Sequence, residues 1–231
     1  MTRTQPGKPG LLFDLDGTLT NADHFHHAAF NVLLAQSGRQ IDQAQFHAKV
    51  MGRANAVIFA ELFPDVPPSL HKVLADEKEA QYRALAHTLH PLPGLVALLT
   101  QARAQGVACV VVTNAPRANA KHSIHALGLT QYFSAVVCGE ELPHSKPHPL
   151  PYEEGLRLAG IDVAHAVGFE DSIAGLQAGI AAGLPMMGMT TGLSASTLTG
   201  EGATLAIADY TSLEMLGFAS ARCGVNLAGG R

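Results

Sequence analysis

The stretch LLFDLDGTLT, Leu11–Thr20, decides how this chain is interpreted, because an apolar segment of strand length ends in two aspartates separated by one residue. The interior of a sheet has no use for Asp14 and Asp16. Two carboxylates this close repel each other and lose hydration, which is unfavourable unless a cation or a proton compensates. Gly17 follows at once and permits a tight turn. The stretch therefore predicts a buried strand that carries a charged site at its carboxyl end.

Beyond residue 90, short apolar segments alternate with segments of helical spacing. Further strands are expected at VACVVVTN (107–114), AVVCGE (135–140) and HAVGFED (165–171), with one or two more at PMMGMT (185–190) and TLAIAD (204–209). Strands alternating with helices are typical of parallel crossover units. The predicted fold is therefore α/β, with a Rossmann-like parallel sheet. The Gly- and Ala-rich tail FASARCGVNLAGGR (218–231) is expected to be peripheral or mobile.

Residues 21–90 differ from the rest of the chain. They are rich in Ala, Gln, His and Leu at helical spacing and contain no convincing strand. We therefore expect a helical domain, 21–90, inserted after the first strand of an α/β core domain made of residues 1–20 and 91–231. The insertion lies at the carboxyl edge of the sheet, where ligands bind in open α/β folds.

Composition narrows the classes of function. The chain has 231 residues, 47% of them hydrophobic, and a formal charge of −4. It is long enough for a sizeable core, and it has no basic excess that would favour nucleic acid as a partner. No apolar run reaches membrane-spanning length, and MTRTQPGKPG (1–10) lacks the apolar centre of a signal peptide. The three cysteines are expected to be reduced thiols, and the expected location is cytoplasmic.

Polar residues follow four of the predicted strands. Parallel strands would bring these residues to one edge of the sheet: Asp14 and Asp16, Thr113 and Asn114, Lys146, Glu170 and Asp171. Mg²⁺ prefers oxygen ligands and usually takes one or two carboxylates, leaving positions for water and phosphate. A lysine supplies a point charge for a phosphate group, and a threonine supplies a neutral donor. The pattern indicates a magnesium and phosphate site.

This set of motifs resembles the haloacid dehalogenase (HAD) superfamily, in particular its phosphatase and β-phosphoglucomutase-like branch with a helical cap. The four motifs stand in order as DLDGT, VVTN, the lysine of HSKPHP, and GFEDS, and the resemblance runs from Leu11 to about Asp209. It implies a Mg²⁺-dependent hydrolase of a small phosphorylated metabolite, with residues 21–90 as the cap domain. Oligomeric state is not encoded in these motifs, and a monomer or weak homodimer is the default expectation.

The resemblance also implies roles for individual residues. Asp14 would attack phosphorus and form an aspartyl-phosphate, and Asp16 would act as general acid and then general base. The phosphoryl oxygens would be held by Thr113, Asn114 and Lys146. The metal would be held by Asp14, the backbone carbonyl of Asp16, Asp171 and, directly or as a supporting partner, Glu170.

Three residues of the inserted segment are candidates for contact with Asp16 or the substrate. His26 falls where β-phosphoglucomutase-like members carry a histidine that contacts the acid–base aspartate, and a zinc cluster of His24, His26 and His27 is the less favoured reading. Gly52 and Arg53 fit the Gly-centred specificity loop, with Arg53 a candidate for an anionic substrate. Two departures oppose a mutase: Asn55 replaces an arginine, and no cap lysine is evident near residues 81–86.

The leading hypothesis is therefore a Mg²⁺-dependent phosphatase acting on a sugar phosphate or phosphoglycolate. A sugar phosphomutase, which runs the same aspartyl-phosphate chemistry, is the closest alternative. A hydrolytic dehalogenase is disfavoured because those relatives lack the second aspartate. A phospho-accepting receiver module is disfavoured because such modules are shorter and have no helical insertion. A catalytically inactive binding protein is disfavoured because it would be expected to have lost one of the four motifs.

Overall fold

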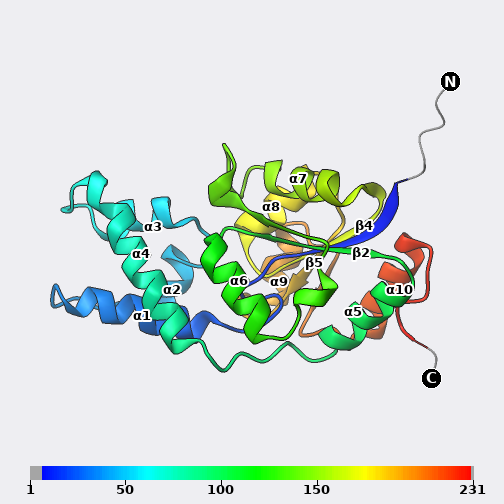
Figure 1. Ribbon diagram of the computed structural model, residues 1–231, viewed down its shortest axis with the longest axis horizontal. Coiled ribbons are helices and arrows are strands. Elements are labelled where there is room, and N and C mark those ends of the chain that lie inside the picture. The colour runs from blue at the N-terminus through cyan, green and yellow to red at the C-terminus, as the bar shows by residue number, and fades with distance from the viewer. Residues whose placement is uncertain (1–6, 230–231) are drawn as a thin grey trace.

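Six parallel strands form one sheet in the order β3-β2-β1-β4-β5-β6 (Figure 1). The structure is a computed structural model that describes residues 7–229, so part of the MTRTQPGKPG segment and the last two residues of the tail lie outside it. The strands are β1 (Lys8–Phe13), β2 (Ala108–Thr113), β3 (Ala135–Cys138), β4 (Ile161–Glu170), β5 (Met186–Met189) and β6 (Leu205–Ile207). The predicted α/β fold with a parallel sheet is confirmed.

Helices cover both faces of the sheet and make three layers. Alternate residues of β1 point to opposite faces, so Leu11 and Phe13 pack into one apolar cluster and Leu12 into the other. The first face is covered by α5 (Leu95–Ala104), α6 (Arg117–Ala126) and α10 (Leu213–Cys223). The second is covered by α7 (Leu150–Ala159), α8 (Ile173–Ala181) and α9 (Ala195–Gly200). Two short 3₁₀ turns, Thr130–Tyr132 and Gly139–Glu141, flank β3.

The segment between β1 and α5 is helical and has its own apolar cluster. It consists of α1 (Asp23–Ala35), α2 (Gln43–Lys49), α3 (Asn55–Leu62) and α4 (Pro68–Leu85), which lie together on the left of Figure 1 beside the sheet. Phe30, Phe46 and Phe59 are buried in a cluster separate from the two that sandwich the sheet. The division of the chain at residues 20 and 90 stays a prediction.

The expectation of a peripheral or mobile tail was wrong for residues 218–223 and for Leu227. Residues 218–223 belong to α10, which packs against the sheet beside β4. Met215, Ala219 and Cys223 recur at helical spacing and are buried, as is Leu227 beyond the helix. The small Ala and Cys side chains let the helix approach the sheet, and this made the segment look featureless in the sequence.

The strand order creates a switch point between β1 and β4. Successive strands are added on one side of β1 as far as β3, and the chain then returns to the other side with β4. Connections on the two sides of such a point diverge and leave a crevice at the carboxyl ends of the strands. The residues that follow β1 and β4 are Asp14 and Asp171, so the fold places the two acidic motifs side by side.

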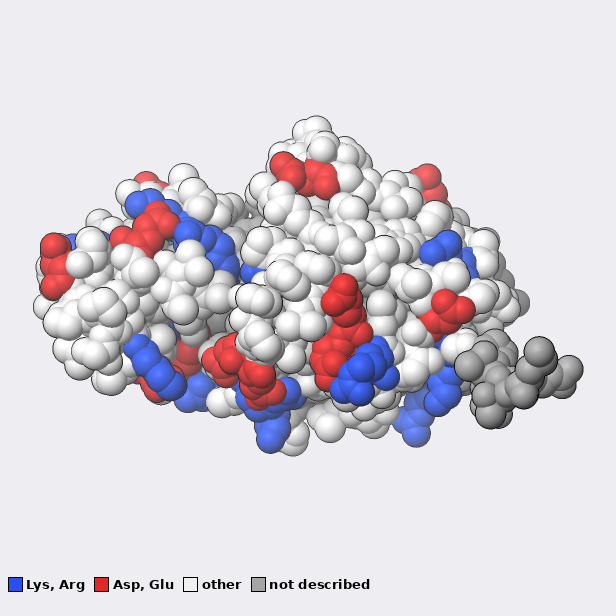
Figure 2. Space-filling view, turned by 90° about the horizontal axis from the view of Figure 1, so that it is seen from above, with Lys and Arg blue, Asp and Glu red and all other residues white. Residues whose placement is uncertain are grey.

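Within residues 7–229, no helix is both long and apolar enough to span a membrane. All three cysteines are buried free thiols, as the sequence predicts. On the face shown in Figure 2, Lys and Arg side chains are interspersed with Asp and Glu and form no continuous basic patch.

Candidate active site

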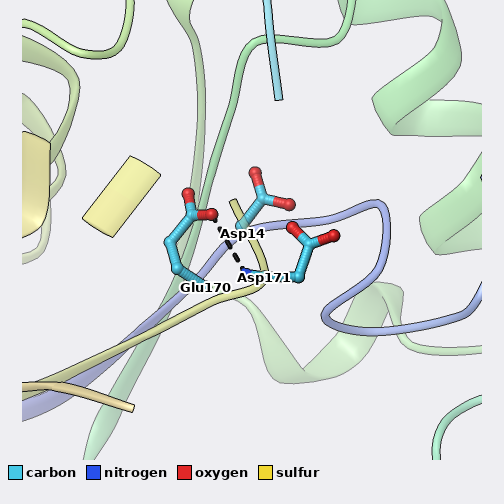
Figure 3. A group of neighbouring side chains, drawn as sticks. All are labelled: Asp14, Glu170 and Asp171. Atoms are coloured by element: carbon cyan, nitrogen blue, oxygen red, sulfur yellow. Dashed lines mark hydrogen bonds between the residues drawn. The ribbon is translucent and has the colours of Figure 1, made fainter. Parts of the chain in front are cut away.

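Three carboxylates meet at the switch point. Asp14 follows β1, Glu170 ends β4 and Asp171 follows it, and one oxygen from each lies within 4.8 Å of the others (Figure 3). All three residues are buried. Figure 3 shows the carboxylate groups of Asp14 and Asp171 facing one space, with Glu170 beside them. Like charges at this separation are unfavourable unless a cation or a proton compensates them.

Lys146 supplies one positive charge from the loop that precedes α7. Its ammonium group donates to Asp14 Oδ1 at 2.6 Å, to the carbonyl of Val112 at 2.7 Å and to Glu170. Glu170 also accepts from the Tyr152 hydroxyl at 3.1 Å and from Ser172 Oγ at 3.0 Å. With both oxygens of Glu170 engaged in this way, Glu170 holds Lys146 in place beside Asp14.

Lys146 alone does not provide partners for all the carboxylate oxygens of the site. Among the described residues, buried Asp16 Oδ1 and Asp171 Oδ2 have no hydrogen-bond partner. Burial, with repulsion from Asp14 and Glu170, raises the pKa of Asp171 well above its ordinary value. Gly17, at φ +79°, lies so close that a Cβ there would overlap the Asp171 carboxylate. Unpartnered, hard oxygen donors in a buried acidic cluster are what a divalent cation such as Mg²⁺ requires, so these residues fit it.

Thr113 and Asn114 lie at the carboxyl end of β2, beside the acidic cluster. Thr113 Oγ1 accepts from the backbone N–H of Ala115 at 3.0 Å, which leaves its hydroxyl hydrogen free to point into the site. Asn114 Nδ2 donates to the carbonyls of Gly52 and Lys146, each at 3.2 Å. Asn114 therefore ties the lysine loop to the inserted helical segment, and it would reach a phosphate only by exchanging one of those bonds.

The loop between α2 and α3 closes over the acidic cluster at Gly52. Its backbone has φ +70°, which strongly favours glycine, and a Cβ there would lie 2.5 Å from Ser172 Oγ. Ser172 also begins α8, because its hydroxyl accepts from the N–H of Gly175. Gly52 is thus the point where the helical segment touches the core next to Asp171.

We expect Gly52→Ala to lower kcat/KM for any substrate about 10- to 100-fold, because the added methyl group holds the loop away from Ser172 and misplaces the groups above the site. Steady-state kinetics measure this. Gly38→Ala is the matched control: Gly38 has φ +67° and nothing within 4 Å of an added Cβ. It carries the same backbone cost without the contact, so its kcat/KM should match wild type. Equal kinetics for the two variants would contradict the contact argument.

His26 lies on α1 next to the second aspartate of the motif. Its Nε2 is 3.5 Å from Asp16 Oδ2, and its ring stacks on Tyr82 at 3.8 Å between centroids. Lys78 Nζ lies 3.0 Å from His26 Nδ1. Because an ammonium group can only donate, Nδ1 accepts and Nε2 carries the proton that faces Asp16. The geometry therefore presents a donor to the Asp16 carboxylate.

Lys78 was not among the predicted site residues, although it lines the cleft. Residues 81–86 contain no lysine, as noted from the sequence. Lys78 lies on α4 with Glu79, and both are buried. Lys78 donates to Glu79 Oε1 at 2.9 Å, and Asn55 donates to the same oxygen at 2.8 Å. Burial alone would raise the pKa of Glu79, but Lys78, His26 and Asn55 hold it below its usual range. The sequence could have indicated this burial, because Lys78 and Glu79 fall at helical spacing on the same face of α4 as Ala75 and Tyr82.

Arg53 lines the same cleft but is already engaged. Its Nη1 donates to Glu61 Oε2 at 2.8 Å and to the carbonyl of Lys49 at 2.8 Å. This bond holds the pKa of the Glu61 carboxyl below its usual range. Asp23, at the start of α1, also lines the cleft and was not predicted as a site residue. His24 and His27 do not join His26: His27 contacts the carbonyl of Ile41 instead.

Comparison with known proteins agrees with this geometry. The sequence profile of a family described as haloacid dehalogenase-like hydrolase matches residues 11–189. A phosphoglycolate phosphatase of Xylella fastidiosa (strain Temecula1) is 31% identical over 178 residues, covering 77% of this chain and 78% of that protein. A fructose-1-phosphate phosphatase of Escherichia coli (strain K12) is 30% identical over 178 residues, covering 76% of this chain and 93% of that protein.

The fold also matches solved structures. A β-phosphoglucomutase from Clostridium difficile superposes with a TM-score of 0.82, covering 94% of this chain and 97% of that one, at 19% identity. At that identity the likeness concerns the fold alone. It includes the helical segment between the first strand and α5, because the covered share leaves little of either chain out.

Proposed function

The chain belongs to the haloacid dehalogenase-like hydrolase family, and from that premise we propose that it is a Mg²⁺-dependent phosphatase that hydrolyses a small organic phosphate monoester. The observation that carries the proposal is the buried arrangement of Asp14, Lys146 and Asp171 beside Asp16. A carboxylate nucleophile, a cation for the phosphoryl oxygens and a second carboxyl group for proton transfer are the parts that this reaction needs.

In the first step, a carboxylate oxygen of Asp14 attacks phosphorus. The new bond is an aspartyl-phosphate, and the bond from phosphorus to the ester oxygen breaks. Asp16, protonated at the start, gives its proton to that leaving oxygen, so the product departs as an alcohol. Lys146 and the hydroxyl of Thr113 hold phosphoryl oxygens as charge moves onto them. The N–H of His26 steadies the Asp16 carboxylate that this step leaves behind.

In the second step, the Asp16 carboxylate takes a proton from a water molecule, and the water oxygen attacks the phosphorus of the aspartyl-phosphate. The bond to Asp14 breaks, inorganic phosphate leaves, and both aspartates return to their starting states. One positioned general acid–base group contributes roughly 10²–10⁴ in rate. Splitting one displacement into two lets the same pair serve both halves of the reaction.

The metal site would be formed by Asp14, Asp171 and the backbone carbonyl of Asp16, with Glu170 supporting them through Lys146 and Ser172. A bound Mg²⁺ would neutralise charge on the phosphoryl oxygens and on the clustered carboxylates. We propose further that residues 21–90 are a cap domain over the core of 1–20 and 91–231, and that Gly52, Arg53 and His26 meet the substrate from the cap.

A sugar phosphomutase is the second candidate, because His26 contacts Asp16 and the buried Lys78 contacts the other nitrogen of the His26 ring. Asn55 still occupies the position of an arginine and is bonded to Glu79. The curated relatives named above are phosphatases, and they favour hydrolysis.

The test is phosphate release from a panel of esters, with Mg²⁺ and with EDTA. The panel contains fructose 1-phosphate, glycerol 3-phosphate, phosphoglycolate and a chromogenic aryl phosphate. We expect release with Mg²⁺ and a loss of at least about 100-fold with EDTA, because Lys146 alone does not balance both Asp14 and Asp171. Restoring Mg²⁺ should restore the rate. Equal rates with Mg²⁺ and with EDTA would contradict the proposed Mg²⁺ requirement. Conversion of glucose 1-phosphate to glucose 6-phosphate without phosphate release would favour the mutase.

A further inference from the structure

The wall of the cleft formed by α3, α4 and the loop before α3 contains two basic side chains. Both are already paired with carboxylates: Arg53 with Glu61 at 2.8 Å and Lys78 with Glu79 at 2.9 Å. Lys78 is buried and additionally lies over the Phe30 ring. Among the described residues, this wall therefore offers no cation whose charge is uncompensated.

Before any metal is bound, the side chains that line the cleft carry more acidic than basic groups. Its charged lining comprises five acidic residues, Asp14, Asp16, Asp23, Glu79 and Asp171, and three basic ones, Arg53, Lys78 and Lys146. Lys146 is engaged at the phosphoryl end of the site by Asp14 and Glu170. A second anionic group on the substrate would have to compete with Glu61 for the charge of Arg53, or with Glu79 for the charge of Lys78. Burying a charge without its own partner costs more than the new contacts return.

The same wall suits neutral hydroxyl groups. The Arg53 guanidinium directs Nη1 to Glu61 and Lys49, and its other N–H groups can donate to a hydroxyl oxygen. Asn55 offers an amide carbonyl as an acceptor beside Glu79. Phe46, Val50 and Met51 provide an apolar surface for a carbon skeleton.

We propose that this enzyme selects monophosphates whose leaving group is a neutral polyol or sugar, and that it discriminates against esters with a second anionic group, such as phosphoglycolate or a bisphosphate. This rests on the phosphatase function proposed above. Glu61 and Glu79 are the discriminating residues: each neutralises a cation that would otherwise attract a carboxylate or a second phosphate. Specificity here comes from a repulsive element as well as from attractive contacts.

The test compares kcat/KM of the wild-type enzyme on fructose 1-phosphate and glycerol 3-phosphate with that on phosphoglycolate and fructose 1,6-bisphosphate. We expect the neutral esters to be preferred at least about 10-fold. Glu61→Gln frees the charge of Arg53, so kcat/KM for phosphoglycolate should rise about 2- to 5-fold, mostly through KM, while fructose 1-phosphate changes little. Glu61 is a partly exposed surface residue, so the variant should fold.

Glu154→Gln is the matched control. It removes the acidic partner of Arg157 on α7, makes the same change in net charge and lies outside the cleft lining. Its substrate profile should equal wild type. The inference would be overturned if wild type hydrolysed phosphoglycolate as well as the sugar phosphates and if Glu61→Gln and Glu154→Gln had the same substrate profile. That outcome would leave the proposed phosphatase function intact. Release from none of the esters with Mg²⁺ present would instead remove the phosphatase function, and this inference with it.

Discussion

Asp14→Asn should reduce phosphate release by at least about 10⁴-fold, because a neutral amide does not attack phosphorus and the aspartyl-phosphate does not form. The substitution keeps the size of the side chain and an acceptor for Lys146, which donates to Asp14 Oδ1. The fold should therefore survive. The measurement is steady-state release from the best ester of the panel, with circular dichroism to verify folding.

Asp209→Asn is the control for that variant. Asp209 also comes shortly after a strand of the sheet, β6, but it is half-buried, its carboxylate accepts from Thr211, and it lies outside the cleft lining. Its turnover should stay within about 2-fold of wild type, as for a surface substitution away from a site. Normal turnover by Asp14→Asn would eliminate the aspartyl-phosphate mechanism.

Lys146→Met should have the largest effect on stability. It leaves Asp14 and Glu170 buried beside Asp171 with no cation, and removing one member of a buried charge pair costs about 3–5 kcal/mol in the free energy of unfolding. Activity should fall as well, because Lys146 contacts Asp14, the proposed nucleophile. Urea unfolding in EDTA measures the stability without a contribution from metal.

The loss should be larger at high pH than at low pH. Burial raises the pKa of Asp14 and Lys146 opposes that rise, so the variant raises the Asp14 pKa further. A carboxyl group with a raised folded-state pKa binds more protons in the folded protein, so its stability falls as pH rises through that pKa. Lys72→Met is the control: Lys72 pairs with Asp76 on the surface of α4, and its loss should cost below about 0.5 kcal/mol. Equal destabilisation in both variants would contradict the buried network.

The core of the site could be predicted from the sequence because its signals are local. Asp14 and Asp171 each follow an apolar run, and strand ends of a parallel sheet share one edge, so their meeting follows from the alternation of strands and helices. The place of Lys146 in the site could be predicted from its spacing and its flanking prolines. The roles of these residues stay predictions, while their juxtaposition is a feature of the structure.

The side-chain pairings in the cleft wall formed by α3, α4 and the loop before α3 could not be predicted in the same way. Nothing in one sequence separates a buried lysine on an amphipathic helix from a solvated one, so Lys78 passed unnoticed. Its neighbour Glu79 is held by Asn119 of α6, which is 40 residues away. The contact of Arg53 with the substrate stays a prediction, but the sequence gives no sign that Glu61 pairs with it. Such pairings depend on how α3 and α4 pack, and helical spacing alone does not encode them.

The order of the strands also bears on how the protein forms during synthesis. Leu11 of β1 pairs with Val167 of β4 as well as with Cys109 of β2. Until β4 leaves the ribosome, β1 is an edge strand with one row of N–H and C=O groups unpaired, and such edges invite association between chains. The helices α1–α4, in contrast, have their partners within a short stretch of chain, and local contacts form first. Asp14 is thus made before the strands that surround it, and its site is complete only after β4 has emerged.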